Sequence, residues 1–175
     1  ESSVSANEKS GIENPLIVAE TDESIVALDL DGNEVVLSKE PQRVIPNHTS
    51  MLGLWYLAGG TAVGRPETRG GTDIPPEAMD LETTGSVVYP NTEKILALRP
   101  DFVILSNIDN HRNLQSVLVD VGIENIILSY DNYSDFVHIL DLFARLIGNS
   151  EIVNKVVPDL HNEVQLIIDK YRDNQ

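Results

Sequence analysis

The stretch Tyr89–Ser106, with the sequence YPNTEKILALRPDFVILS, predicts a short helix, an abrupt stop and a buried strand. Asn91 or Thr92 stands where a side chain can cap the helix by accepting a backbone N–H bond. Pro100 cannot continue the helix and disfavours helical geometry at the residue before it. The unbroken apolar run Phe102–Leu105 then has the length of a strand that is covered on both faces, as in a parallel sheet.

The rest of the chain predicts further strands and helices in alternation around this unit. Ser24–Leu30 and Glu34–Leu37 flank the turn Asp31–Asn33 and predict a β-hairpin. The elements expected after it are strands at Arg43–Ile45, Ala62–Gly64, Ser86–Val88 and Asn125–Leu128, and helices at Met51–Ala58, Asn110–Val121, 134–147 and 150–175. This order predicts an α/β, Rossmann-like lobe with a central parallel sheet flanked by helices and right-handed crossovers. Pro158 is expected to kink the long final helix or to shift its start.

Composition narrows the classes of function. A chain of 175 residues is long enough for one domain with a sizeable core. Its formal net charge of −16 argues against nucleic-acid binding, which needs clustered Lys and Arg to neutralise phosphates. The absence of cysteine excludes disulfides, thiolate catalysis and cysteine-ligated zinc sites. An enzyme is the second hypothesis, but no G-x-G-x-x-G follows the first strand and no catalytic triad or carboxylate pair is recognisable.

The pattern N-x-E-K-I-x-A-L-x-P-D-x-V-I at Asn91–Ile104 resembles the N-terminal lobe of ABC-importer binding proteins for iron–siderophore, haem or vitamin B12. Two further segments, Leu28–Ile45 and Leu118–Leu128, agree with the same family in the same order. The resemblance covers roughly residues 25–175. It implies a protein without turnover or intrinsic cofactor that captures a ferric siderophore or haem and delivers it to the membrane permease. Vitamin B12 (cobalamin) is the alternative ligand in the same family.

The resemblance also implies a domain organisation. Residues 1–23 are expected to form a flexible N-terminal tether, residues 24–149 the ligand-binding lobe, and residues 150–175 a helix leading to a second lobe that this chain lacks. The tether implies an exported lipoprotein on the extracellular face of the membrane, or a periplasmic protein. If the single lobe is the natural product, its unpartnered cleft face is expected to form a homodimer or another interaction.

The candidate ligand-binding residues lie at the carboxyl ends of the expected strands, because open parallel sheets bind their ligands there. These residues are Asn47, His48, Arg65, Arg69, Tyr89, Asn107, Arg112 and Tyr130. The arginines suit an anionic chelate and the tyrosines suit a flat one, while solvation and rim packing remain the structural alternatives. A metal site within the chain is not expected, because His48 and His111 alone fall short of the three or four ligands that zinc needs.

Glu93 matches the glutamate that, in the resembled family, docks into an arginine pocket on the membrane subunits of the importer. The structural alternative is stabilisation of the helix N-terminus by a carboxylate in its first turn. One departure from the family lies next to His48. Many relatives carry an acidic residue early in the first helix, whereas this chain has Thr49-Ser50-Met51, which leaves the type of ligand open.

Overall fold

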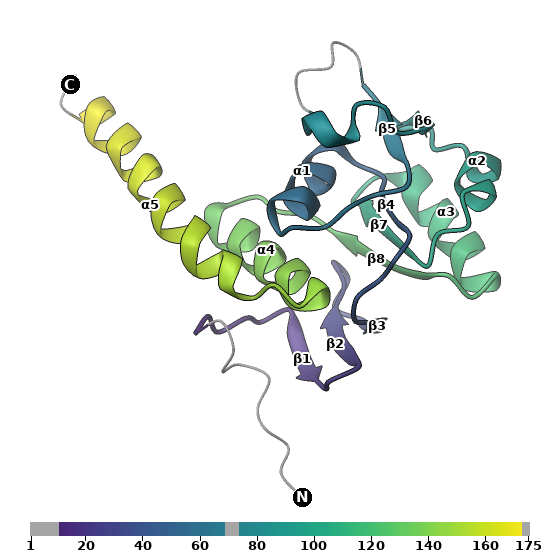
Figure 1. Cartoon of the computed structure of the whole chain (residues 1–175), viewed down its shortest axis with the longest axis horizontal. Coiled ribbons are helices and arrows are strands. Elements are labelled where there is room, and N and C mark those ends of the chain that lie inside the picture. Colours follow the sequence, from purple (N-terminus) through teal and green to yellow (C-terminus); the bar gives the residue numbers. More distant parts are fainter. Residues whose placement is uncertain (1–10, 69–73, 173–175) are drawn as a thin grey trace, which may run out of the picture.

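The computed structural model of the chain describes residues 11–68 and 74–172, and a parallel β-sheet forms its centre (Figure 1). The three strands of this sheet are β4 (Val44–Pro46), β7 (Phe102–Ser106) and β8 (Glu124–Leu128). They lie in the order β4–β7–β8, with β7 hydrogen-bonded to a parallel neighbour on each side. The predicted central parallel sheet is therefore confirmed, and its strands present their carboxyl ends at one common edge.

A second parallel pair of strands lies beside β4. The two strands are β5 (Arg65–Glu67) and β6 (Thr83–Ser86). The Val63 N–H donates to Val44 O over 2.9 Å just before β5 begins. The expected strands at Ala62–Gly64 and Ser86–Val88 are therefore wrong in position. Strands this short hold too few apolar residues for a hydrophobic pattern to place them, and their register comes from pairing with each other.

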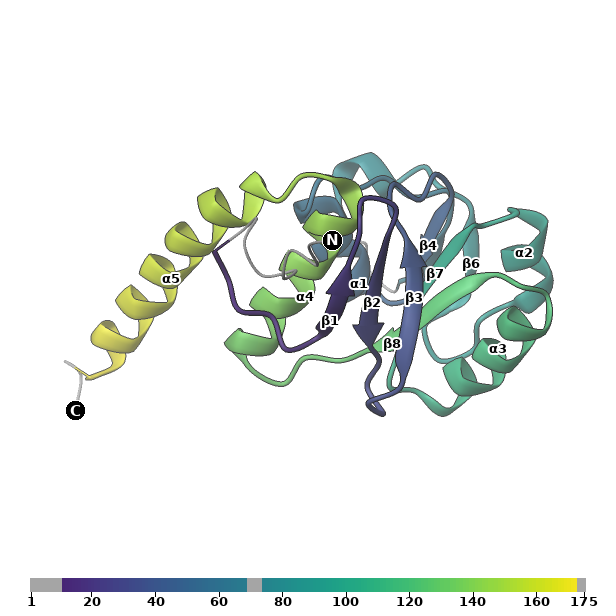
Figure 2. The same ribbon diagram turned by 90° about the horizontal axis from the view of Figure 1, so that it is seen from below.

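Four helices cover the two faces of the central sheet (Figure 1, Figure 2). They are α1 (Thr49–Leu57) and α4 (Tyr133–Ile147) on one face, and α2 (Thr92–Ala97) and α3 (Asp109–Asp120) on the other. Successive residues of β7 point to opposite faces, so Phe102 packs with Trp55 and Phe143 while Val103 packs with Leu118. This arrangement explains the unbroken apolar run of β7, which is buried on both sides.

The connection between α2 and β7 follows the prediction. The Asn91 side chain accepts the Lys94 N–H over 3.0 Å and caps α2, and Pro100 prevents the helix from continuing. Arg99, the residue before the proline, takes a positive φ of 47°. The 3₁₀ turn η1 (Pro76–Ala78) lies in the long connection that precedes β6.

A three-stranded antiparallel sheet precedes the central sheet (Figure 2). Its strands are β1 (Ile17–Glu20), β2 (Ser24–Leu28) and β3 (Glu34–Ser38). The hairpin of β2 and β3 confirms the prediction, but β1 lies within residues 17–20, which were expected to belong to the tether. The tether prediction is wrong for this part, because β1 pairs with β2 and the buried Asn14 side chain donates to Asp141 Oδ2 over 2.8 Å. Residues 1–10 lie outside the described residues.

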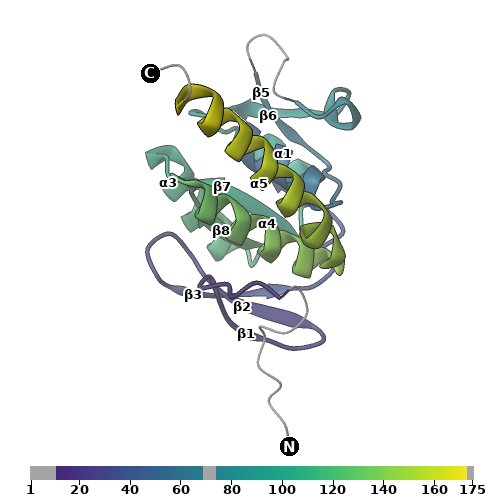
Figure 3. The same ribbon diagram turned by 90° about the vertical axis from the view of Figure 1, so that its left-hand side faces the viewer.

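The final helix, α5 (Glu151–Arg172), begins against α4 and then extends beyond the body of the lobe (Figure 1, Figure 2). Figure 3 views the molecule from the side on which α5 projects, so the helix lies in front of α4 there. Val153, in the first turn of α5, is fully buried, and the helix continues through Pro158. Within the residues that the structure describes, no helix combines the length and the apolar character needed to cross a membrane.

Candidate functional site

A cavity of about 260 Å³ lies at the carboxyl edge of the central sheet, and we call it the edge cavity. Its walls come from the residues that follow β4, from the end of β7 and from the residues after β8. The lining residues are His48, Ser50, Met51, Ser106, Asn107, Ile108, Ser129 and Tyr130. The structure therefore brings together three of the predicted site residues, which are His48, Asn107 and Tyr130. No lysine, arginine or carboxylate belongs to the described lining.

His48 is the N-cap of α1. Its neighbours Asn47, Thr49 and Ser50 belong to the residue types that cap helices most often, so the sequence favours one of them as the cap. Its Nδ1 accepts the Ser50 N–H at 3.2 Å and lies 2.7 Å from Ser50 Oγ. Burial lowers the pKa of His48 below its ordinary value, so the ring is neutral at pH 7. Because Nδ1 acts as the acceptor, the proton resides on Nε2. His48 thus offers a neutral N–H donor as part of the cavity wall.

His111 is an internal support for the edge cavity and is fully buried. Its Nδ1 accepts the Ser106 N–H at 2.9 Å, so its Nε2 carries the proton and donates to Val87 O at 2.7 Å. Burial lowers the pKa of His111 despite these two backbone hydrogen bonds. The imidazole therefore ties the end of β7 to the segment after β6, and both of its nitrogens are in use.

Ser106 is the lining residue whose hydrogen bonding is incomplete. It is 7% exposed, and its Oγ is buried without a hydrogen-bond partner among the described residues. A buried hydroxyl without a partner costs about 1–3 kcal/mol. A ligand group that reached this oxygen would recover that cost, so Ser106 is a candidate contact that the hydrophobic pattern of β7 did not single out.

Asn47 was expected to contact the ligand, and the structure places its side chain beneath the edge cavity. It is fully buried; its Oδ1 accepts from Thr84 Oγ1 at 2.9 Å, and its Nδ2 lies 3.3 Å from His111 Nε2. The hydrogen bond to Thr84 holds the end of β4 to β6, and the Asn47 amide packs against the His111 ring. Asn47 therefore has a structural role here, as a link between the strand ends.

Tyr130 lines the edge cavity and also a more open apolar groove of about 440 Å³. The groove is lined by Tyr130, Asp131, Asn132, Tyr133, Phe136 and Leu160. Tyr130 meets Phe136 edge-on with ring centroids 5.7 Å apart, and Tyr133 stacks on Phe136 at 6.4 Å. The Tyr133 hydroxyl donates to Val157 O at 3.2 Å, which fixes the ring against α5. The apolar groove therefore continues the edge cavity along α4 and α5.

Arg112 stands close to the edge cavity, but its charge is already paired. Its guanidinium forms a two-pronged ion pair with Asp31, and its Nη2 lies 3.4 Å from Asn107 Oδ1. The ion pair lowers the pKa of Asp31 and raises that of Arg112. Asp31 comes from the β2–β3 turn, far away in sequence, so no sequence pattern marked this partner.

The remaining predicted ligand residues do not line the edge cavity. Arg65 donates to Met79 O at 3.0 Å and to Pro66 O at 3.2 Å, and so holds its own loop. Tyr89 is 74% exposed and lies in the connection between β6 and α2. Arg69 lies outside the described residues. Ligand contact by these three residues stays a prediction.

Glu93 occupies the first turn of α2 and is exposed. Its carboxylate has no hydrogen bond or ion pair within the described part of the chain. The position suits both interpretations from the sequence, docking to another protein and stabilisation of the helix N-terminus.

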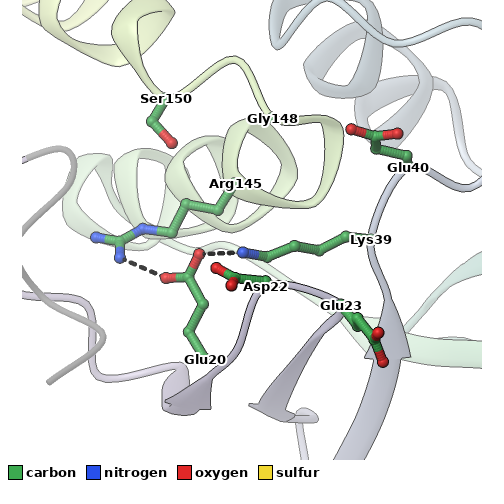
Figure 4. Close-up of a pocket in the computed structure, with 8 residues that line it drawn as sticks. All are labelled: Glu20, Asp22, Glu23, Lys39, Glu40, Arg145, Gly148 and Ser150. Atoms are coloured by element: carbon green, nitrogen blue, oxygen red, sulfur yellow. Dashed lines mark hydrogen bonds and ion pairs between the residues drawn. The ribbon is translucent and has the colours of Figure 1, made fainter. Parts of the chain in front are cut away.

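A second cavity, of about 450 Å³, lies at the opposite end of the lobe, where α4 ends and before β4 begins. Figure 4 shows its lining, which consists of Glu20, Asp22, Glu23, Lys39, Glu40, Arg145, Gly148 and Ser150. The Glu20 carboxylate bridges Lys39 Nζ at 2.6 Å and Arg145 Nη1 at 3.1 Å, and Arg145 Nε donates to Asp141 Oδ2 at 2.9 Å. We call these four residues the charge cluster. Across the described residues, no group of His, Asp and Glu is arranged to hold a metal ion.

Comparison with known proteins places this geometry in context. No family model matches the chain, and no curated protein matches it in sequence. Its structure does match solved substrate-binding proteins. A substrate-binding protein of an ABC transporter from Listeria monocytogenes aligns with 78% of this chain and 52% of its own, at 19% identity and a TM-score of 0.65.

Two proteins of Vibrio cholerae match in the same way. The periplasmic vitamin B12-binding protein aligns over 78% of this chain and 53% of its own, with 24% identity and a TM-score of 0.65. The periplasmic catecholate-siderophore-binding protein aligns over 87% of this chain and 55% of its own, with 15% identity and a TM-score of 0.69. The chain therefore spans about half the length of these proteins, and it has the fold of one lobe of an ABC-transporter substrate-binding protein.

Proposed function

We propose that this chain is the ligand-binding lobe of an ABC-importer component that captures an iron complex, a siderophore or haem, and delivers it to the membrane permease. Vitamin B12 is the alternative ligand. The observation that carries the proposal is the edge cavity, which opens at the carboxyl edge of the sheet in a fold shared with such binding proteins. The lobe binds without turnover and acts outside the cytoplasmic membrane.

The domain organisation forms part of the proposal. Residues 24–149 form the lobe, extended at its beginning by β1, and α5 is the connection to a second lobe that would close over the edge cavity. The direction of α5 supports this role, because the helix leaves the body of the lobe (Figure 1, Figure 2). An exported protein tethered near the membrane, with or without a lipid, is the setting in which such a component works.

A ligand screen tests the proposed function directly. Trp55 is the chain's single tryptophan and lies on the buried face of α1, so coloured ferric siderophores, haem and cobalamin should quench its fluorescence on binding. We expect saturable quenching by at least one of these metal complexes and none by the metal-free siderophore at the same concentration. If calorimetry at high protein concentration also detects no binding of any complex, the proposal is wrong.

Replacing Glu93 by alanine tests the proposed delivery step. Glu93→Ala should leave ligand affinity unchanged and reduce uptake into cells about ten-fold or more, because a docking carboxylate acts only on the permease. The control is Glu151→Ala, which removes an exposed first-turn glutamate from α5. Both changes should cost less than about 1 kcal/mol of stability. Equal uptake by the two variants would reduce Glu93 to a helix-end residue.

A further inference from the structure

We propose that the edge cavity selects a metal chelate of low negative charge with an apolar or aromatic portion, and that Asp31 enforces this choice by neutralising Arg112. The inference rests on the proposed function and names the class of ligand within it. A neutral or cationic ferric trihydroxamate belongs to this class, and a polyanionic ferric tricatecholate does not.

The first argument is the chemistry of the cavity wall. The polar groups of the described lining are neutral: they include the His48 imidazole, and the Ser106 hydroxyl is buried beside the cavity without a partner. Such groups satisfy amide, hydroxamate or hydroxyl functions of a ligand. A polyanion needs cations to offset the loss of its hydration, and the described walls contain none.

The second argument is the state of Arg112. It is the described cation next to the cavity, and its two-pronged ion pair with Asp31 occupies the fork that would otherwise bind a ligand carboxylate or catecholate. Asn107, which lines the cavity, receives the remaining weak contact of Arg112 Nη2 at 3.4 Å. A ligand anion would have to displace Asp31 to use this arginine.

The third argument is the negative electrostatic field of the chain together with the apolar groove beside the cavity. The formal charge of −16 repels polyanions over distances comparable to the size of the lobe at low salt. The apolar groove shares Tyr130 with the edge cavity and offers the rings of Tyr133 and Phe136 to an apolar portion of a ligand. One ligand that spans both needs a polar, weakly charged end and an apolar end.

The test compares two probes on three forms of the 175-residue chain. The probes are a neutral ferric trihydroxamate and a polyanionic ferric tricatecholate, with affinity measured by calorimetry at low and at physiological salt. The forms are the wild type, Asp31→Asn and Glu34→Gln, where Glu34 is an exposed acid on the same hairpin. The control removes the same charge without releasing Arg112.

We expect the wild type to bind the trihydroxamate about ten-fold or more tightly than the tricatecholate. Asp31→Asn should raise tricatecholate affinity about two- to five-fold, most strongly at low salt, and leave trihydroxamate affinity unchanged. Glu34→Gln should alter neither affinity. Tighter binding of the tricatecholate by the wild type, or equal gains in the two variants, would overturn the inference while the proposed function survives. Binding of neither probe, nor of haem or cobalamin, would overturn the proposed function itself.

Discussion

The edge cavity and the charge cluster occupy opposite ends of the same lobe, and they differ in whether their polar groups are neutral or charged. The cavity beside the charge cluster is the larger of the two, at about 450 Å³ against 260 Å³. Three of the charged residues that line it are bonded to one another, with Glu20 held between Lys39 and Arg145. The edge cavity is smaller and its described lining is uncharged. Ser106 Oγ is buried there without a partner, as Asp141 Oδ1 is in the charge cluster.

This contrast teaches that the size of a cavity is a poor guide to function within this fold. The charges of Glu20, Lys39 and Arg145 pair with one another and hold β1, the end of β3 and α4 together. The neutral Ser106 hydroxyl stays unpaired at the end of β7 and costs stability, and that cost can be recovered when a ligand binds. We therefore assign stability to the charge cluster and recognition to the edge cavity, and three substitutions test this division.

The largest effect is expected from Arg145→Met. This arginine is fully buried, and its loss would leave the Glu20 and Asp141 carboxylates without their shared cation. Breaking a buried ion pair on one side costs about 3–5 kcal/mol of unfolding free energy. Denaturant titration would measure the loss, with the exposed Lys155→Met as the control, expected to change stability by less than about 0.5 kcal/mol. A loss below about 1 kcal/mol for Arg145→Met would remove the structural role of the cluster.

A smaller effect is expected from Ser106→Ala, which should leave stability unchanged or raise it while it lowers the affinity for the ligand. Removal of the unpartnered hydroxyl should leave the unfolding free energy unchanged or raise it by up to about 1 kcal/mol. The affinity for the bound chelate should fall about five-fold, equivalent to about 1 kcal/mol. Ser150→Ala, the same change beside the charge cluster, should not affect affinity. Loss of stability together with unchanged affinity would assign Ser106 to the core instead.

The smallest effect is a change in the pH dependence of stability at Glu20. Burial acts to raise the pKa of Glu20, but the hydrogen bonds and charges of Lys39 and Arg145 outweigh it and hold the pKa below the ordinary value of 4.5. Since the folded pKa is the lower one, Glu20 stabilises the fold above the unfolded pKa, and this contribution is lost as the pH falls toward the folded pKa.

Unfolding free energies measured at a series of pH values below about 5 should therefore decline less steeply in Glu20→Gln than in the wild type. The matched control is the same substitution at Glu23, an exposed residue beside the same cavity. Identical slopes for wild type and Glu20→Gln would mean that the carboxylate gains nothing from its two cations.

Sequence patterns were sufficient for the central sheet because its signals are local. The apolar run of β7, the stop at Pro100 and the cap at Asn91 each act within a few residues, and each appears in the structure as predicted. The strand β1 escaped prediction because its stability comes from pairing with β2 and from the Asn14–Asp141 hydrogen bond. The apolar run Leu16–Ala19 is a local strand signal, but it is short and follows a polar segment that resembles a tether.

The candidate site was predictable in position and only partly in detail. The rule that ligands bind at the carboxyl ends of parallel strands selected the edge where His48, Asn107 and Tyr130 meet. The pairing of Arg112 with Asp31 was not predictable, because it joins residues far apart in sequence. The burial of Asn47 was also hidden, since its partner Thr84 lies on another strand.

The central claim, that the edge cavity is the recognition site, is tested most directly by mapping a bound chelate onto the lobe. Gallium(III) has the charge of ferric iron and is diamagnetic, so a gallium trihydroxamate allows backbone amide shifts to be followed by NMR during a titration. We predict saturable shifts concentrated at Ser50, Asn107 and Tyr130, with little change at Glu20, Lys39 and Arg145. Shifts concentrated at the charge cluster, or the absence of any saturable shift, would contradict the account.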